Sequence, residues 1–160
     1  KKNPKKAFEE FKKSAELKSS EGMFYLGLMY HNGEGVEKNY ETAREWYFKS
    51  AEAGNGDAAN NLGCMYENGE GGSKDYIKAI EYYEKAAQLG DSDAMNNLGA
   101  IYHDGQVVKA DYEKAREWYE KAVELGNKKA IYNLGKMYLN GQGVKVDYIK
   151  AKELFESALR

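Results

Sequence analysis

Apolar residues along this chain follow the spacing of amphipathic helices. Between residues 56 and 67 they recur three and four positions apart, which predicts one apolar face on a helix. That face consists of Ala58, Ala59, Leu62, Met65 and Tyr66. A second helix is predicted over residues 75–89, and its apolar face consists of Tyr76, Ala79, Ile80, Tyr83, Ala86 and Ala87. The pattern therefore predicts a pair of helices joined by a short loop.

The same pair recurs every 36 residues without insertion or deletion. The dipeptide Leu-Gly marks the register, with its glycines at Gly27, Gly63, Gly99 and Gly135. Near the start, Ala7 and Phe11 fall one period before Ala43 and Tyr47, which indicates a lone second helix. Because an isolated pair cannot bury its apolar face, we expect the pairs to stack.

The predicted fold is all-α, a right-handed αα-superhelix (solenoid) of about nine helices. We expect a single domain over residues 1–160, which consists of a half-repeat at 1–18 and repeats at about 19–54, 55–90, 91–126 and 127–160.

Glycine and capping residues agree with these boundaries. Second helices are predicted to end before glycines in the left-handed region, namely Gly54, Gly90 and Gly126. N-caps are expected at Asn55, Asp75, Asp91, Asp111, Asn127 and Asp147. The Leu-Gly glycines lie mid-helix, where glycine costs about 1 kcal/mol relative to alanine. We interpret this repeated cost as room for Tyr47, Tyr83 and Tyr119 of the second helices.

The stretch "YENGEGGSKDY" at residues 66–76 resembles a phosphate-binding loop at first sight. Gly69 and Gly71 recur in the other copies, however, and the Asp75 carboxylate is expected to occupy the helix N-terminus. We therefore interpret the glycines as turn residues with positive φ. Two departures follow. Val107 replaces the second glycine in the third copy, so that loop should differ locally, and Gly72 replaces a valine, which should make its loop the loosest.

These motifs together resemble the Sel-one-like repeat, a relative of the tetratricopeptide repeat with a slightly longer unit. The pattern "NLGxxYxxGxGVxxDYxKAxxWYxKAxxxG" covers essentially the whole chain. The resemblance implies a scaffold for protein–protein contact. Members often carry paired cysteines, which this chain lacks, so its stability should come from packing. Two alternatives stay open, a groove for a small ligand or glycan and a structural spacer in a longer array.

In such stacks the first helices line the concave face, and their outward positions vary between copies while the core positions do not. We expect a peptide or protein partner to contact these positions: Phe24, Tyr25, Leu28, His31, Asn60, Asn61, Cys64, Glu67, Asn96, Asn97, Ala100, His103, Tyr132, Asn133, Lys136 and Leu139. Within this set, Asn61, Asn97 and Asn133 form a ladder whose amides suit an extended peptide backbone. The alternative is that they bond a neighbouring helix.

The first copy adds the apolar side chains of Phe24, Tyr25 and Leu28. They could anchor a partner side chain, or they could pack against the lone N-terminal helix. At the other end, Leu154, Phe155 and Leu159 have no following repeat to cover them, which favours further repeats, a cap or self-association.

Charge narrows the partner classes. The net charge of −2 and pI of about 5.8 do not favour nucleic acid, and the lysines of residues 1–18 alternate with glutamates as on a solvated helix face. No apolar run approaches the ~20 residues that span a bilayer. Since the chain lacks an initiator methionine, we expect it to be part of a longer protein.

Reactive side chains are few. The only histidines, His31 and His103, hold the same slot two repeats apart, which is too far to share a metal ion, and we expect both to be solvated. The single Cys64 excludes an intramolecular disulfide and lies mid-helix, away from the cations that activate a thiolate. No Ser/His/Asp set, HExxH or CxxC spacing occurs. We therefore predict no enzymatic activity, no cofactor and no metal site.

Overall fold

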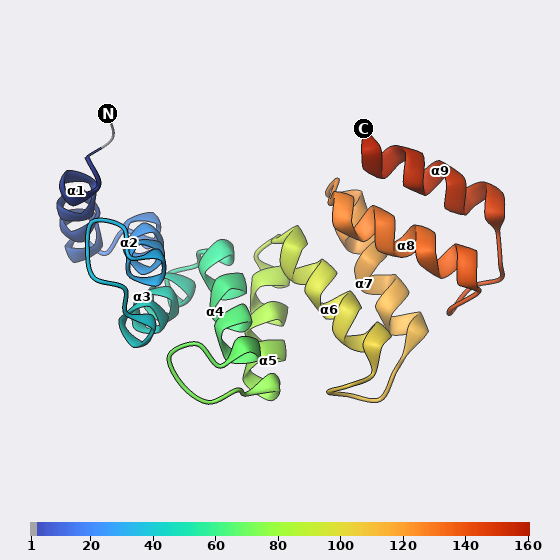
Figure 1. Cartoon of the computed structure of the whole chain (residues 1–160), viewed down its shortest axis with the longest axis horizontal. Helices are drawn as coiled ribbons and strands as arrows, with labels where there is room; N and C mark the ends of the chain where they lie inside the picture. The colour runs from blue at the N-terminus through green and yellow to red at the C-terminus, as the bar shows by residue number, and fades with distance from the viewer. Residues whose placement is uncertain (1–2) are drawn as a thin grey trace. The chain divides into compact units, whose positions relative to one another are not determined.

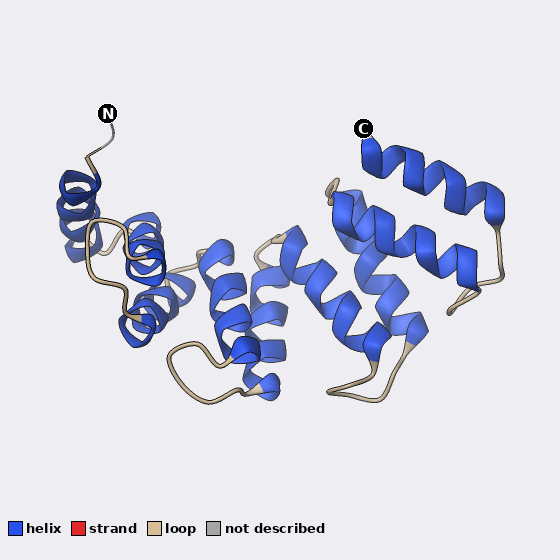
Figure 2. Ribbon diagram, viewed as in Figure 1, coloured by secondary structure: helices blue, strands red, loops and turns tan. Residues whose placement is uncertain are grey.

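A computed structural model describes residues 3–160 of the chain, and within them it contains nine α-helices and no strands (Figures 1 and 2). Their bounds are α1 Pro4–Glu16, α2 Ser20–Asn32, α3 Tyr40–Glu52, α4 Gly56–Asn68, α5 Tyr76–Gln88, α6 Ser92–Asp104, α7 Tyr112–Glu124, α8 Lys128–Asn140 and α9 Tyr148–Leu159. They pack as helical hairpins, so the predicted all-α repeat solenoid is confirmed.

The predicted N-caps are confirmed at every repeat. Asn55 Oδ1 accepts from Ala58 N at 2.9 Å, and Asp75 Oδ1 accepts from Lys78 N at 3.0 Å. Asp91, Asp111, Asn127 and Asp147 make the same bond. Each bond satisfies an N–H group that the first turn of a helix leaves without an intrahelical partner. The caps therefore explain why helix boundaries recur at a constant spacing.

The mid-helix glycines lie directly under aromatic rings of the second helices. A Cβ at Gly27 would lie 2.8 Å from Cδ1 of Tyr47, and one at Gly63 would lie 2.7 Å from the Tyr83 ring. At Gly99 the nearest atom is Cε1 of Tyr119 at 2.5 Å, and at Gly135 it is Cε1 of Phe155 at 2.8 Å. No real Cβ contact is that short, so the predicted reason for these glycines is confirmed.

The buried apolar side chains follow the predicted faces. On α4 they are Ala58, Ala59, Leu62 and Met65, and on α5 they are Ala79, Tyr83, Ala86 and Ala87. Tyr76 was expected on the apolar face but is 38% exposed, because it is the first residue of α5. Alanines occupy much of the core. Their small side chains, like the mid-helix glycines, permit the helices to approach closely.

The loop glycines have the positive φ that the turn interpretation requires. In the loop after α4, Gly69 has φ 71° and Gly71 has φ 76°. A Cβ at Gly71 would also lie 2.7 Å from the carbonyl oxygen of Tyr40, so this loop packs against the start of α3. Lys18 is the sole non-glycine residue with positive φ between residues 3 and 160. Val107 therefore does not adopt the conformation of its glycine counterparts, and the expected local difference is confirmed.

Gly72 makes room for an arginine. A Cβ there would lie 2.6 Å from Nη1 of Arg44. The Arg44 guanidinium lies 4.2 Å from the centre of the Tyr66 ring, and its Nη2 donates to the carbonyl oxygen of Met65 at 3.2 Å. Two periods later, where Val144 stands at the position of Gly72, Arg116 Nη1 instead donates to the carbonyl oxygen of Gly143 at 3.3 Å. That the loop of Gly72 is the loosest stays a prediction.

The chain divides into two compact units, which we call unit 1, ending at Gly90, and unit 2, Asp91–Arg160. Unit 1 contains α1 to α5, and unit 2 contains α6 to α9.

We predict that Gly99→Leu lowers the free energy of unfolding by about 3 kcal/mol, because the new side chain must displace the Tyr119 ring from a filled site. Urea unfolding followed by circular dichroism would measure the change. An unchanged midpoint and slope would contradict the packing explanation.

Gly99→Ala gives the matched control. In a helix this change ordinarily stabilises by about 1 kcal/mol, but here it should destabilise. In a Tyr119→Ala background the ring is gone, and the same change should become stabilising.

Candidate partner-binding site

Two stripes of side chains in unit 1 point away from the core. Residues spaced by three and four positions share a helix face, so α4 carries the stripe Asp57, Asn61, Cys64 and Asn68. The corresponding stripe on α2 is Glu21, Tyr25, Leu28 and Asn32. All eight are half-buried or exposed. Both stripes are thus available for contact within one unit.

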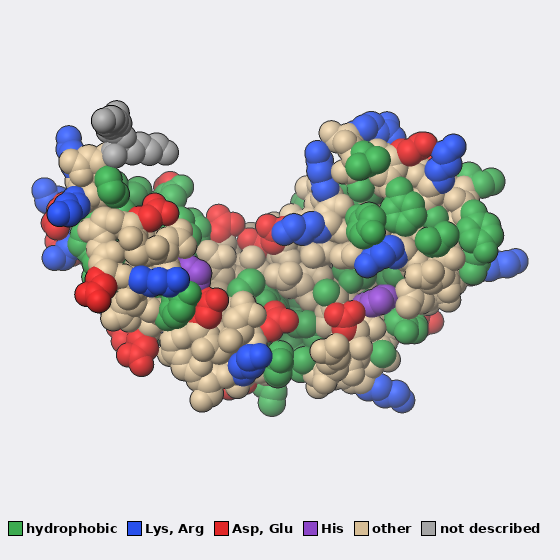
Figure 3. Space-filling view, viewed as in Figure 1, with side chains coloured by type: hydrophobic (Ala, Val, Ile, Leu, Met, Phe, Trp, Pro, Cys, Tyr) green, Lys and Arg blue, Asp and Glu red, His purple; other side chains and the backbone are tan. Residues whose placement is uncertain are grey.

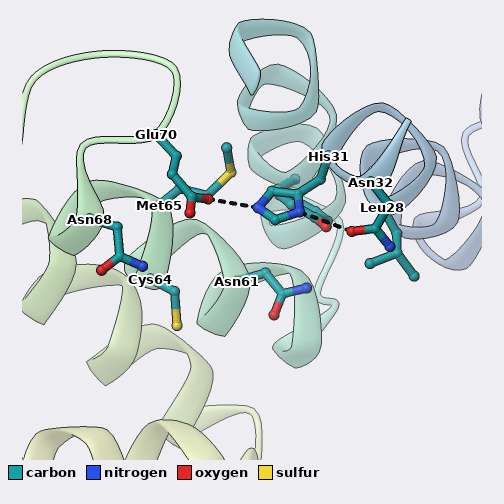
Figure 4. Close-up of a pocket in the computed structure, with 9 residues that line it drawn as sticks. Leu28, His31, Asn32, Asn61, Cys64, Met65, Asn68 and Glu70 are labelled. Atoms are coloured by element: carbon teal, nitrogen blue, oxygen red, sulfur yellow. Dashed lines mark hydrogen bonds and ion pairs between the residues drawn. The ribbon is translucent and has the colours of Figure 1, made fainter. Parts of the chain in front are cut away.

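A hollow of about 290 Å³ lies between these stripes (Figure 4). From α2 it is lined by Leu28, His31 and Asn32, from α3 by Tyr47, from α4 by Asn61, Cys64, Met65 and Asn68, and from the following loop by Glu70. Four of the side chains expected to contact a partner, Leu28, His31, Asn61 and Cys64, therefore meet in one place.

His31 links two repeats across this hollow. Its Nε2 lies 2.6 Å from Oε2 of Glu70, and its Nδ1 lies 3.2 Å from Oδ1 of Asn32 (Figure 4). In unit 2, His103 Nε2 lies 3.0 Å from Oε1 of Gln142. The expectation of solvated histidines is wrong, because each ring reaches the residue that follows the glycine cap of the next first helix.

Tyr47 forms part of the inner wall of the hollow and is 1% exposed. Burial raises the pKa of Tyr47 to about 12, while a hydrogen bond with Asn61 acts in the opposite direction and the charges of Glu70 and Cys64 raise it further. Asn61 therefore joins α4 to the buried ring of α3 while it faces the hollow.

Tyr83 of α5 organises the other side of α4. Its hydroxyl donates to Oε2 of Glu67 at 2.5 Å and lies 3.3 Å from Sγ of Cys64. Burial, the largest cause, raises the pKa of Tyr83, and Cys64 and Glu67 act in the same direction. The neutral phenol of Tyr83 thus orients the Glu67 side chain but does not neutralise the charge of its carboxylate.

The asparagine ladder makes bonds between neighbouring helices in each unit. Asn61 bonds Tyr47 in unit 1, and in unit 2 Asn133 Nδ2 donates to Oδ1 of Asn96 at 3.0 Å. Asn96 is 7% exposed, whereas Asn60 and Asn97 are half-buried. Asn61 and Asn133 therefore follow the second alternative, in which the amides bond a neighbouring helix.

Of the two aromatic side chains expected to anchor a partner, Tyr25 packs against α1, whereas Phe24 lies between Tyr25 and Tyr47 of α3. Tyr25 stacks on Phe11 with ring centres 4.7 Å apart, and Phe24 contacts Tyr25 at 5.2 Å. Leu28 differs, because it lines the hollow beside α4 and also a larger one of about 620 Å³ beside α1. Of the three, Leu28 is the side chain that two hollows share.

In unit 2 the corresponding face carries exposed apolar side chains and the cation of Lys136. Tyr132 is 52% exposed and Leu139 is 42% exposed. Lys136 Nζ lies 5.3 Å from the centre of the Tyr132 ring, which in turn packs on Phe155 at 5.4 Å. Ala100 and His103 on α6 are half-buried.

The sequence reasoning missed Glu70, Gln142 and the hydroxyl groups of Tyr47 and Tyr83. A signal for the first two was present, since Glu70 and Gln142 lie two periods apart, as do His31 and His103. Across residues 3–160 no group of three His, Cys, Asp or Glu side chains is arranged to hold a metal ion. None of the helices in that range is long and apolar enough to cross a membrane.

The Sel1 repeat family model matches residues 1–19, 20–55, 56–91, 92–127 and 128–160. The chain is 38% identical to the Sel1 repeat protein from Oxalobacter formigenes, with a TM-score of 0.95 over 100% of this chain and 65% of that one. It is 32% identical to c5321, a protective antigen present in uropathogenic Escherichia coli strains, with a TM-score of 0.87 over 93% of this chain and 32% of that one.

A third structure, the Helicobacter pylori cysteine rich protein B, is 28% identical, with a TM-score of 0.60 over 77% of this chain and 88% of that one. The comparison with curated proteins found no match. This chain therefore spans less than two thirds of the length of the first two structures.

We predict that the free energy of unfolding falls as the pH rises from about 10 to about 12. In the unfolded chain Tyr47 ionises near its ordinary pKa of 10.0, but in the fold it stays neutral up to about 12. Rising pH therefore favours the unfolded state, by up to about 1.4 kcal/mol for each pH unit in this window. Urea unfolding at pH 9, 10 and 11 would measure the fall.

Tyr83 and Tyr119, whose pKa values burial also raises, act in the same direction, so the matched comparison is Tyr47→Phe. Phenylalanine occupies this slot naturally at Phe11 and Phe155. The variant should lose stability less steeply than the wild type, and equal slopes would refute the role of Tyr47.

Proposed function

Because the chain belongs to the Sel1 repeat family, we propose that it is a non-catalytic scaffold that binds a peptide or protein partner on the outward stripes of its first helices. Sel1 repeat proteins are generally protein-interaction scaffolds, and their repeat fold is a non-catalytic one. The residues that would contact the partner are the outward first-helix positions identified from the sequence, apart from Asn96, which is buried, and Tyr25, which stacks on Phe11 of α1.

The observation that carries this proposal is the hollow between α2 and α4. It combines apolar side chains, such as Leu28 and Met65, with amides that both donate and accept, such as Asn61 and Asn68. Its volume of about 290 Å³ is at the small end of ligand sites, which measure about 300–1,000 Å³. Such a space suits one side chain of a larger partner better than a whole small molecule.

The contrast between core and outward positions supports the same function. The Leu-Gly pair and its aromatic partner are retained in all four copies, while the positions of Phe24 and Leu28 are occupied by Asn60 and Cys64 one repeat later. Variation at outward, half-buried positions over a constant core is what a scaffold needs to recognise one partner among many.

The test is a selection of displayed random peptides on the protein, followed by calorimetry with a selected peptide. We predict that Leu28→Ala weakens binding by about 1 kcal/mol or more, because the side chain borders two hollows. Ile77→Ala is the control, since Ile77 is 81% exposed on α5 and lies on no first helix. Equal losses in both variants, or none in either, would contradict the proposed surface.

The amide ladder has its own test in unit 2. Asn97→Ala with Asn133→Ala should weaken the binding of peptides selected on this protein while the helical circular dichroism signal is retained, since amides pair with peptide backbone groups. Undiminished affinity would remove the ladder from the binding surface.

A further inference from the structure

The larger hollow beside α1 corresponds to the hollow between α2 and α4 one period earlier, but it lacks one wall. Much of its lining stands 36 positions before the lining of the smaller hollow, namely Phe11, Tyr25, Leu28, Met29 and Glu34 before Tyr47, Asn61, Cys64, Met65 and Glu70. The smaller hollow is closed on one side by α2, the first helix of its hairpin. Within residues 3–160 no helix precedes α1, so the wall that the larger hollow lacks is a first helix. We call this space of about 620 Å³ the α1 hollow.

The face of α1 that borders this hollow is the one that other second helices bury. Ala7 and Phe11 line the hollow and are half-buried. One period later Ala43 is 0% exposed and Tyr47 is 1% exposed, because α2 packs on them. The same alanine position is also buried in α5, α7 and α9. On the face seen in Figure 3, hydrophobic surface lies beside the lysines at the α1 end of unit 1.

The hairpins of the chain show what such a face accepts. In each of them a glycine of the first helix lies under an aromatic ring, and a Cβ at Gly135 would lie 2.8 Å from the ring of Phe155. Phenylalanine therefore suits this contact, and Phe11 occupies the same slot in α1. A helix that packs on α1 in this way needs a glycine opposite Phe11. The first helices of the last three repeats share the pattern Ala-x-x-x-Leu-Gly around that glycine, and it begins at Ala58, Ala94 and Ala130.

A second copy does not offer a helix of this type. Within residues 3–160 the first helices α2, α4, α6 and α8 each pack in a hairpin with the second helix that follows. The first and last helices of the same range, α1 and α9, are both second helices. Charge does not select the occupant either, since Lys6 and Glu10 line the α1 hollow with opposite signs. The fit of an apolar helix face into an apolar groove, a common mode of partner recognition, is what remains.

From the missing wall, the half-buried face of α1 and the repeated contact between glycine and ring, we infer that the α1 hollow binds an amphipathic helix of a partner protein with the pattern Ala-x-x-x-Leu-Gly. The glycine of that helix packs against Phe11, and its apolar face covers Ala7. The inference goes beyond the proposed function, because the bound segment is a helix and docks mainly on a second helix.

The experiment supplies the helix as a synthetic peptide of residues 91–104 with a fluorescent label. This segment contains its own N-cap, Asp91, and the pattern around Gly99. The matched peptide carries Gly99→Leu. Leucine is a better helix former than glycine, so weaker binding of the matched peptide reports overlap with the ring and not loss of helix. Because short isolated helices are marginal in water, fluorescence anisotropy is followed up to about 1 mM of the whole chain.

Two variants of the chain locate the binding. Ala7→Gln puts a longer side chain into the α1 hollow, whereas the control Lys13→Gln changes an exposed position of α1 outside its lining. Thermal unfolding checks that both variants remain folded. We expect the Gly99→Leu peptide and the Ala7→Gln chain each to weaken binding about tenfold or more. Lys13→Gln should change it less than about twofold, as for most surface substitutions.

Equal affinities of the two peptides, equal effects of the two variants, or no binding up to about 1 mM would overturn the inference. Light scattering that shows a dimer which Ala7→Gln dissociates would also overturn it, because a second copy would then be the occupant. The proposed function fails separately. Displayed peptides that lose affinity on Leu28→Ala but not on Ala7→Gln would leave that proposal standing, whatever the helical peptide does.

Discussion

The contact between a mid-helix glycine and the aromatic ring of the following helix is the constraint on which this fold depends. Any side chain at Gly27, Gly63 or Gly99 would overlap a tyrosine ring, so the spacing within each hairpin is set at one point per repeat. Since a glycine and an aromatic residue recur at these positions every 36 residues, each of the four hairpins makes the same kind of contact. The helix caps recur in the same way, and the loop turns do so except where Val107 replaces a glycine with positive φ.

A core built in this way does not constrain the outward side chains of the first helices through hairpin packing, but these side chains make other contacts. Asn61 bonds the buried Tyr47, and His31 bonds Glu70 of the next repeat. These side chains hold adjacent repeats together and also line the hollow. Stability and recognition are therefore coupled at this surface, and binding data on polar variants need a parallel measurement of folding. Leu28, which makes apolar contacts only, separates the two effects most cleanly.

Helices, caps, turn glycines and the glycine–aromatic contact could all be predicted because each depends on residues within one repeat, where periodicity reports directly on structure. The histidine links could not, since they join residues 39 positions apart and depend on side-chain reach. For Tyr25 the sequence left two alternatives open, and its stacking on Phe11 of α1 agrees with packing against the lone N-terminal helix. Contacts within one repeat can be predicted from its sequence, whereas contacts between neighbouring repeats can be identified only from a three-dimensional structure.

The replacement of Glu67 and Glu70 by Leu139 and Gln142 shows how one backbone geometry can present different chemistry. His103 Nε2 lies 3.0 Å from Oε1 of the neutral Gln142, whereas His31 Nε2 lies 2.6 Å from Oε2 of the Glu70 carboxylate. Because the link survives either choice, the charge of the residue after the glycine cap is not needed to join repeats.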